Sequence, residues 1–359
     1  MMPKIPRAGT VMAAASILTV TACSSAAEEQ VSEDPQVRPA DADYGACLIS
    51  DSGGWNDESF NQSAYEGLMR AVEDLEIGYD EAESTYEWDF EPNMEEMLEA
   101  ECDLIFGIGF NLQETLNTSA DAQPDTDFAL VDDVFADEHE NAKALVFNTG
   151  EAAYLAGYLS AGMSETGTVG TWGGMPIPSV TVFMDGFSDG IDRYNEDNDA
   201  DVDLVGWDKE TQEGSFSDDF ADRAQGELVT EQLIAWGADI IMPVAGQSGL
   251  GAGDPIADAG AKMVWVDSDG YMSTRYGDVV LTSVMKKISE AVYDTIEEGE
   301  ADQFGSETYV GDLENEGVGL APFHEFEDDV PQQLVDDLDR LREEIISGET
   351  VIESENAPT

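Results

Sequence analysis

From Tyr44 onward, short apolar runs alternate with longer amphipathic stretches along the chain. Such alternation is typical of strands connected by helices that pack on the sheet. The clearest helix is predicted over 60–75, where the apolar residues recur at helical spacing and give one nonpolar face. Ser59, followed by Gln62 three positions later, predicts a capping box at the start of this helix. The pattern therefore favours an α/β protein.

The same pattern divides the chain into two successive series of elements. The first is predicted to contain strands over 46–49, 104–108, 128–131 and 144–147 and helices over 60–75, 92–99 and 113–120. The second is predicted to contain helices over 151–163, 180–194, 220–236 and 255–259 and strands over 168–172, 202–207, 239–244 and 263–266. The chain then continues with a strand over 279–282, a helix over 283–297, a short strand pair near Tyr309 and Val318, and a helix over 332–346.

Two series of this kind predict two Rossmann-like lobes of similar size, each built on a parallel sheet. In open α/β sheets, ligands bind beyond the carboxyl ends of the strands. Glycine and aspartate gather at those predicted ends, which are 50–54, 107–110, 132–133, 173–176, 246–251 and 267–270. Glycine allows close backbone approach and aspartate accepts hydrogen bonds, so these segments are the candidate site.

Composition and charge narrow the classes of function. The 359 residues are 42% hydrophobic, which excludes wholesale disorder. The 14 Lys and Arg residues against 79 Asp and Glu residues give a net charge of −65, which excludes a nucleic-acid partner. Such an excess of carboxylates favours a halophilic protein that folds in concentrated salt, where self-repulsion is screened. An acidic protein from an ordinary organism is the alternative.

The N-terminus carries the features of an export signal. Lys4 and Arg7 precede an apolar run over 11–20, and a small residue stands directly before Cys23. We expect 1–22 to be a lipoprotein signal peptide and Cys23 to carry the lipid, with an ordinary signal peptide as the alternative. The polar segment 23–43 would then be a disordered tether. This interpretation places the protein at the cell membrane, lipid-anchored on its extracytoplasmic face.

Catalytic and metal chemistry find little support. The chain has no phosphate-binding loop with the G-x-x-x-x-G-K-[ST] pattern and no complete nucleophile elbow around Ser248. His139 and His324 lie in acidic, loop-like surroundings typical of solvated residues. No zinc-ligand spacing occurs, and acidic runs such as 197–201 and 267–270 favour solvated loops over a calcium cage. We therefore predict no enzyme, no cofactor and no metal.

Two cysteines remain once Cys23 is set aside. Cys47 and Cys102 each lie beside an apolar run that predicts a strand. In an oxidising compartment they could form a disulfide, and buried free thiols are the alternative.

The segment 51–67, which reads DSGGWNDESFNQSAYEG, resembles the opening signature of the basic membrane protein family. Further stretches agree with that family in the same order: 107–110, 152–158, 173–178, 183–187, 214–218 and 281–287. Members of the family are lipoprotein substrate-binding components of ABC importers. The resemblance implies the type I periplasmic-binding-protein architecture, with three crossovers between two lobes and a ligand held in a central cleft between them. With such crossovers, we expect the first lobe to comprise 44–147 with part of 267–300, and the second to comprise 148–266 with part of 301–359.

The resemblance also implies roles for individual residues. Asp51, Asn56 and Asp57 would line the wall of the first lobe, while Phe60 would stack on a base. Asp132 would bind the edge of the base. The remaining implied ligand-binding residues are Asp267 and Lys286 for the ribose hydroxyls, Asp269 beside them, and Phe183 and Gly246 closing from the second lobe. This chemistry is reasonable, because hydroxyl donors suit carboxylate acceptors and an aromatic face can hold a planar base.

The expected function is a receptor that binds a nucleoside, with purine nucleosides favoured, and delivers it to an ABC transporter permease. Carboxylates around the ligand disfavour phosphate, so a nucleoside is preferred to a nucleotide. One alternative is a receptor for a sugar or other polyol. Another is a surface sensor or adhesion lipoprotein.

Overall fold

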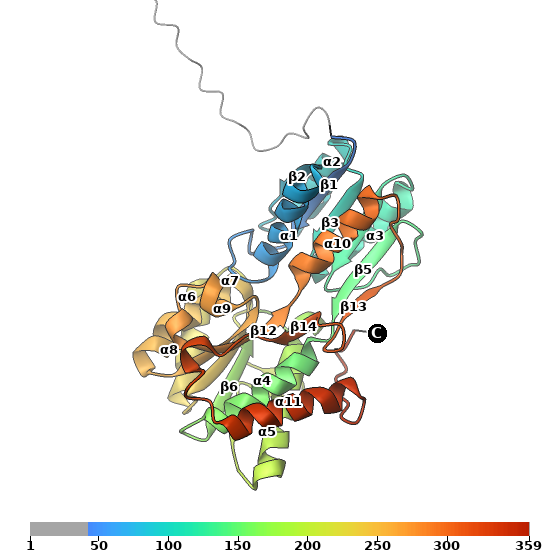
Figure 1. The fold of residues 1–359 in the computed structure, drawn as a ribbon. Helices are drawn as coiled ribbons and strands as arrows, with labels where there is room; N and C mark the ends of the chain where they lie inside the picture. Colours follow the sequence, from blue (N-terminus) through green and yellow to red (C-terminus); the bar gives the residue numbers. More distant parts are fainter. Residues whose placement is uncertain (1–41, 359) are drawn as a thin grey trace, which may run out of the picture. The chain divides into compact units, whose positions relative to one another are not determined.

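The computed structural model describes residues 42–358. The predicted signal peptide, Cys23 and nearly all of the predicted tether lie outside the described residues. The described chain contains two six-stranded sheets with helices packed against them, and a two-stranded ribbon of β8 (Trp207–Asp208) and β9 (Glu213–Gly214) (Figure 1). Among residues 42–358, no helix is both long enough and apolar enough to cross a bilayer.

The first sheet is parallel throughout, in the order β13-β5-β4-β3-β1-β2. Its strands are β1 (Gly45–Ser50), β2 (Gly78–Ala82), β3 (Leu104–Ile108), β4 (Asp127–Val131), β5 (Ala142–Phe147) and β13 (Tyr309–Gly311). The helices of this lobe are α1 (Phe60–Leu75), α2 (Phe90–Glu99), α3 (Gln113–Ala122) and α10 (Ile288–Glu300). Strands β1, β3 and β5 are buried along their whole length, as expected for a parallel sheet covered on both faces.

The second sheet has the order β14-β12-β11-β10-β6-β7, and only β14 runs antiparallel to its neighbour. Its strands are β6 (Thr168–Gly173), β7 (Asp203–Val205), β10 (Ile240–Val244), β11 (Lys262–Asp267), β12 (Val280–Lys286) and β14 (Val318–Leu320). The helices of this lobe are α4 (Thr149–Met163), α5 (Pro178–Asn198), α6 (Arg223–Ala235), α7 (Gly246–Gly249), α8 (Gly253–Ala259), α9 (Gly270–Ser273) and α11 (Gln332–Ile346).

The chain crosses between the two sheets three times, as the family resemblance implies. It passes from β5 to α4, from β12 to α10, and from β13 to β14. The two short strands expected near Tyr309 and Val318 are present as β13 and β14, but they do not pair with each other, because β13 joins the first sheet and β14 joins the second. The segment 267–300 is shared in the same way: β12 lies in the second sheet, whereas α10 packs on α1 of the first lobe.

Several predicted boundaries also shift. The helix expected over 283–297 begins at Ile288, because residues 283–286 continue β12 and pair with β11 and β14. The helix expected over 220–236 begins at Arg223, where the Asp222 side chain accepts hydrogen bonds from the first turn. The strand expected over 202–207 is divided into β7 and β8. Strand β2 was not predicted.

Helix α5 is held against α4 by close backbone contact. A Cβ atom on Gly186 would lie 2.2 Å from the carbonyl oxygen of Gly150, and one on Gly190 would lie 2.0 Å from that of Tyr154. Only glycine permits such an approach. The contact fixes the position of Phe183, which projects from the same helix toward the other lobe.

Cys47 of β1 and Cys102, just before β3, form a disulfide. Of the two alternatives left open by the sequence, the structure has the bonded one. A disulfide is typical of proteins that fold in an oxidising compartment.

Candidate functional site

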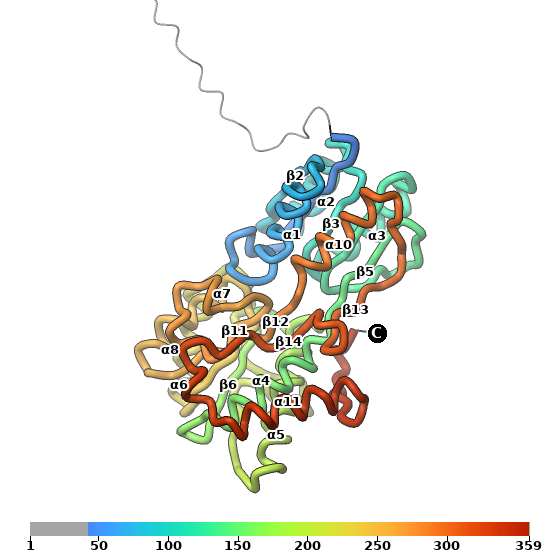
Figure 2. Tube along the Cα trace, in the orientation of Figure 1, coloured from blue at the N-terminus to red at the C-terminus, as the bar shows by residue number. Residues whose placement is uncertain are grey.

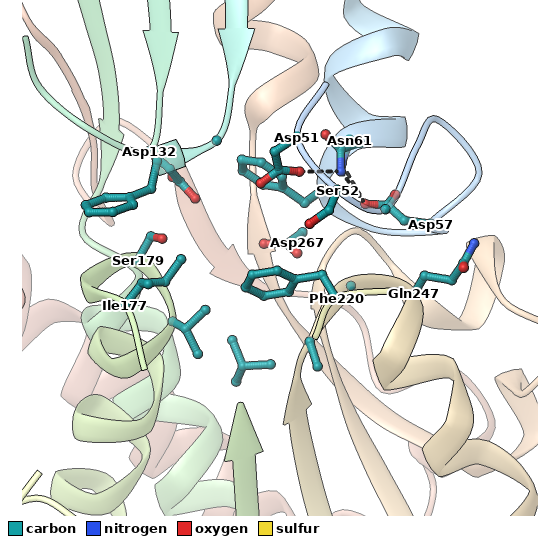
Figure 3. Close-up of a pocket in the computed structure, with 18 of the residues that line it drawn as sticks. Asp51, Ser52, Asp57, Asn61, Asp132, Ile177, Ser179, Phe220, Gln247 and Asp267 are labelled. Atoms are coloured by element: carbon teal, nitrogen blue, oxygen red, sulfur yellow. Dashed lines mark hydrogen bonds between the residues drawn. The ribbon is translucent and has the colours of Figure 1, made fainter. Parts of the chain in front are cut away.

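A cavity lies between the two lobes, where the carboxyl ends of both sheets converge (Figure 3). About 530 Å³ of space free of protein atoms, part of it open to solvent, lies among its lining residues. The first lobe contributes the loops that follow β1, β3 and β4 and the start of α1. The second lobe contributes the start of α5, the loop after β10, and the ends of β11 and β12. We call this cavity the cleft pocket.

Most of the residues singled out from the sequence come together here. Those that line the cleft pocket are Asp51, Asp57, Phe60, Asp132, Phe183, Gly246, Asp267 and Lys286. They come from segments spread over more than half of the chain, so their convergence depends on the fold. The cleft pocket thus combines buried carboxylates, one lysine and aromatic rings.

Asn56 and Asp269 do not line the cleft pocket. The neighbour of Asn56, Trp55, is turned inward, and its main-chain nitrogen donates to Glu83 Oε1 at 2.7 Å. Asn56 is left exposed on a groove outside the cleft pocket. Asp269 caps α9 by accepting from the Tyr271 nitrogen, and it pairs with His324 Nε2 at 2.8 Å. Its role in the structure is that of a cap.

Asp57 organises the first turn of α1. Its Oδ1 accepts from the main-chain nitrogens of Ser59 and Gln62, both at 3.0 Å, and its Oδ2 accepts from that of Asn61 at 2.8 Å. The capping box predicted for Ser59 and Gln62 is therefore wrong. The Ser59 hydroxyl donates instead to Asp267 Oδ2 of the second lobe, at 2.6 Å. The cap of α1 and a contact between the lobes thus share one short segment.

Asn61 lies between two of the carboxylates. Its Nδ2 donates to Asp51 Oδ1 at 3.1 Å and to Asp57 Oδ2 at 3.3 Å (Figure 3). Its Oδ1 is buried and has no hydrogen-bond partner among the described residues. Burial, with further help from neighbouring carboxylates, raises the pKa of Asp51 to about 8, although the Asn61 hydrogen bond acts against it. Asp51 is therefore largely protonated at neutral pH.

Burial also raises the pKa of Asp57, to about 6, against the three main-chain donors that favour its charged form. At neutral pH this carboxyl is mostly ionised. The two neighbouring carboxyls thus differ in the hydrogen bonds that they can form with a ligand. The protonated one can donate a hydrogen bond, whereas the ionised one can only accept.

Lys286 neutralises the other two carboxylates. Its ammonium forms an ion pair with Asp132 and lies 3.8 Å from Asp267 Oδ1. Burial raises the pKa of both carboxyls, and the attraction of Lys286 opposes that rise. The same ammonium lies 4.9 Å from the centre of the Phe60 ring and 5.5 Å from that of Phe183. Cation–π contact therefore adds to the ion pairing.

Asp132 directly follows β4 and Asp267 is the last residue of β11, and both residues have a left-handed backbone conformation. Their φ angles are 70° and 67°. Such conformations cost about 1–3 kcal/mol for residues other than glycine, and they cluster at functional sites. Here the left-handed turn accompanies a carboxylate at the end of β4 and another at the end of β11, and both face Lys286.

Sequence analysis missed some of the lining residues. Asn61 follows Phe60 and stands one helical turn after Asp57, which is the signal that could have found it. Phe220 was placed inside a helix, but it lies in the preceding loop and covers Gly174 closely, with ring carbons 2.3 Å from the site of a Cβ. The pair Gly173-Gly174 was the available signal for a bulky neighbour.

The two histidines stand outside the cleft pocket. The His139 side chain is only 5% exposed and its Nε2 lies 3.1 Å from Asn117 Oδ1, so the expectation of a solvated ring is wrong for this residue. His324 stacks on Tyr271 with ring centres 4.1 Å apart. Among residues 42–358, no cluster of three His, Cys, Asp or Glu side chains is arranged to hold a metal.

Gly109 provides a direct test of how closely the cleft pocket is packed. Its φ is 115°, and a Cβ there would lie 2.3 Å from Asp51 Oδ2. We expect Gly109→Ala to lower the free energy of unfolding by about 1–2 kcal/mol, because the new methyl displaces Asp51 and the backbone is strained. Urea denaturation measures the change. Gly305→Ala, at an open position without positive φ, is the control; equal effects of the two changes would contradict this account.

Two α/β lobes with a cavity between the carboxyl ends of their sheets give this chain the fold of the periplasmic-binding-protein type I solute-binding proteins. A solute-binding protein from Aeropyrum pernix has the same fold, with a TM-score of 0.78 and 23% identity; the match covers 86% of this chain and 94% of that one. The model of the family described as ABC transporter substrate-binding protein PnrA-like matches residues 46–356. The chain belongs to this family, the basic membrane protein family that the segment 51–67 resembles.

Relatives with known names agree with this assignment. The CD4+ T-cell-stimulating antigen of Listeria innocua is 28% identical over 361 aligned positions, which cover 94% of this chain and 95% of that protein. The ABC transporter nucleoside-binding protein BmpA of Lactococcus lactis is also 28% identical, and the match covers 87% of this chain and 90% of that protein. The chain is thus similar to substrate-binding proteins along nearly its whole folded length.

Proposed function

We propose that this protein binds a nucleoside in the cleft pocket and delivers it to the permease of an ABC importer. The observation that carries the proposal is that Asp51, Asp57, Asp132 and Asp267 line one pocket together with Lys286 and aromatic rings. Ribose and base edges offer several hydroxyl and N–H donors, which such acceptors suit. The name of the Lactococcus relative supports the same class of ligand.

The charges of the cleft pocket favour an uncharged ligand. Lys286 is the only cationic residue among its lining residues, and it is already paired with Asp132 and Asp267. A phosphate group would face carboxylates without a free counter-charge. A nucleoside is therefore favoured over a nucleotide. Asn61 Oδ1 adds an acceptor that a donor on the ligand would satisfy.

Delivery requires opening and closing of the lobes. The main-chain oxygen of Glu58, in the first lobe, accepts from Trp265 Nε1 at 3.2 Å and from Ser268 Oγ at 2.9 Å in the second. These hydrogen bonds would form on closure and break on opening. The permease would read the closed form, and no chemical step is needed. A lipid on Cys23 would hold the receptor at the extracytoplasmic face of the membrane.

Isothermal titration calorimetry with a panel of nucleosides, the matching 5′-monophosphates, free bases and ribose tests this proposal. We expect heat with nucleosides, purine nucleosides above all, and none with the monophosphates. Binding of ribose alone would select the sugar receptor instead. Absence of heat with every nucleoside would reject the proposed ligand class.

The aromatic contribution can be measured separately. Phe60→Leu keeps an apolar side chain but removes the flat ring, so we expect nucleoside binding to weaken by about 1–3 kcal/mol. Calorimetry on the variant measures the loss. Phe135→Leu, at a half-buried position outside the cleft pocket, is the matched control and should bind like the unaltered protein. An unchanged dissociation constant for Phe60→Leu would mean that the base does not stack there.

A further inference from the structure

Asp185 is the one acidic residue of the segment 183–187, and the cleft pocket does not use it. It lies on α5 and is 0% exposed. Its Oδ1 accepts from Trp207 Nε1 and from Gln212 Nε2, both at 3.0 Å. A carboxylate buried so completely requires several donors to be tolerated, and these two come from the same lobe.

The other donors to Asp185 come from the end of the chain. Ser354 Oγ donates to Asp185 Oδ2 at 2.6 Å, and Asn356 Nδ2 donates to the same oxygen at 3.1 Å. Lys209 Nζ adds a hydrogen bond to the Glu353 carbonyl oxygen at 2.5 Å. We call the segment 350–358 the C-terminal strap. It returns from α11 toward the level of β13, where the described chain ends (Figure 2).

The strap borders a second cavity directly behind the cleft pocket. Residues 355–358 line this rear cavity together with both lobes, and it contains about 710 Å³ of space free of protein atoms, part of it open to solvent. The first lobe contributes 132–134 and the end of β5, whereas the second contributes the start of α5. Asp132, Ser179 and Lys286 line both the rear cavity and the cleft pocket, so these residues border both spaces.

The cleft pocket has a different border on the opposite side. Ser52, Gly53 and Gln247 line it and also line the groove that holds Asn56, which is bounded by both lobes. A bound molecule would thus lie between an outer groove and the rear cavity. The outer groove is bounded by loops of the two lobes, whereas the rear cavity is bounded by the strap as well.

We propose that the C-terminal strap closes the rear of the cleft, and that Asp185 is the positioning residue that holds it. The inference rests on the proposed function only in assigning a ligand to the cleft pocket. With the strap in place, Lys286 and Asp132 are kept from solvent and the ligand exchanges through the outer groove. When the strap is released, water and ligand gain a second path past Ser179. The strap therefore slows ligand dissociation.

The test uses Ser354→Ala with Asn356→Ala in the full-length chain, because these changes remove the two hydrogen bonds from the strap to Asp185 and substitute no residue of the second lobe outside the strap. We expect the nucleoside dissociation rate, measured by stopped-flow fluorescence, to rise roughly tenfold. Val351→Ser is the control: this residue belongs to the strap, is 70% exposed, and should leave the rate unchanged. Equal rates in the double variant and the unaltered protein would overturn the proposal.

A second background separates positioning by Asp185 from a general structural role. In a chain ending at Glu349 the strap is absent, so Asp185→Asn should accelerate dissociation no further there. In the full chain the same substitution should accelerate it. An equal acceleration in both backgrounds would show that Asp185 acts through Trp207 and Gln212, and would overturn its assigned role.

A measurement without ligand distinguishes failure of the strap from failure of the proposed function. Hydrogen–deuterium exchange of the ligand-free double variant should increase at 132–134 and at 284–288, because these segments include residues that line the rear cavity together with the strap. That increase, together with an unaltered protein that binds no nucleoside, would reject the proposed ligand while supporting the strap. Nucleoside binding with unchanged exchange and unchanged dissociation would instead support the proposed ligand and reject the strap.

Discussion

Replacing Lys286 with methionine should lower the free energy of unfolding by about 3–5 kcal/mol at neutral pH. Methionine preserves the apolar stem and its contacts with the phenylalanine rings, but it removes the ammonium that pairs with Asp132 and Asp267. Their side chains are 9% and 8% exposed, so water cannot replace the lost ammonium. Removal of one partner from a buried ion pair leaves the other charge uncompensated, which is what makes the loss large.

The adjacent residue offers a matched control. Lys287 has a side chain that is 42% exposed, and its ammonium lies 3.8 Å from Glu290 on the surface. Lys287→Met should change the stability by less than about 1 kcal/mol, because surface ion pairs contribute little. Guanidinium denaturation of the two variants makes the comparison. The deficit of Lys286→Met should shrink at acid pH, where Asp132 and Asp267 become neutral; a deficit that is the same at every pH would contradict the electrostatic explanation.

A second large effect concerns pH. The pKa of Asp51 is raised to about 8 and that of Asp57 to about 6, so the folded protein holds protons that the unfolded chain releases near pH 4. Stability from these groups is fully present below the pKa of the unfolded chain and is lost as the pH rises through 6 and then 8. Between pH 6 and pH 8, Asp51 alone should remove about 2–3 kcal/mol.

Asp51→Asn should remove this dependence, because an amide cannot ionise yet can still accept from Asn61. We expect the stability of the variant to change little between pH 6 and pH 8, whereas that of the unaltered protein falls. Asp258→Asn, an exposed carboxyl on α8, is the control and should follow the unaltered protein. Thermal denaturation at constant ionic strength across this range measures both. Parallel curves for all three proteins would mean that Asp51 is ionised throughout.

Much of the fold could be predicted from hydrophobic periodicity. The predicted bounds of α1, β3 and α11 agree with the structure residue by residue. Strand β2 was not predicted because its sequence is largely polar and only Gly78 is buried, which is consistent with its place at the edge of the sheet. The separation of β13 and β14 could not be predicted either, because the partner of a short strand is set by the other strands of its sheet.

Some of the site residues could likewise be predicted from the sequence, and others could not. Strand ends rich in aspartate and glycine indicated Asp51, Asp132 and Asp267, because position in an α/β sheet follows from the strand itself. Asn56 was implied by the family resemblance, and the sequence does not show that Trp55 turns inward and leaves Asn56 exposed. The C-terminal strap gave no signal, since 350–358 is too short and too polar for a period, and its place depends on Asp185 far away in the chain.

The exchange of β13 and β14 between sheets affects the order in which the chain can fold. Until residues 309–320 have been synthesised, β5 and β12 both remain unpaired edges. Exposed edges of this kind recruit strands from other molecules. A growing chain would therefore expose two edge strands until about its last tenth has been synthesised. A delay in collapse, through charge repulsion or a bound chaperone, would protect the chain from self-association during synthesis.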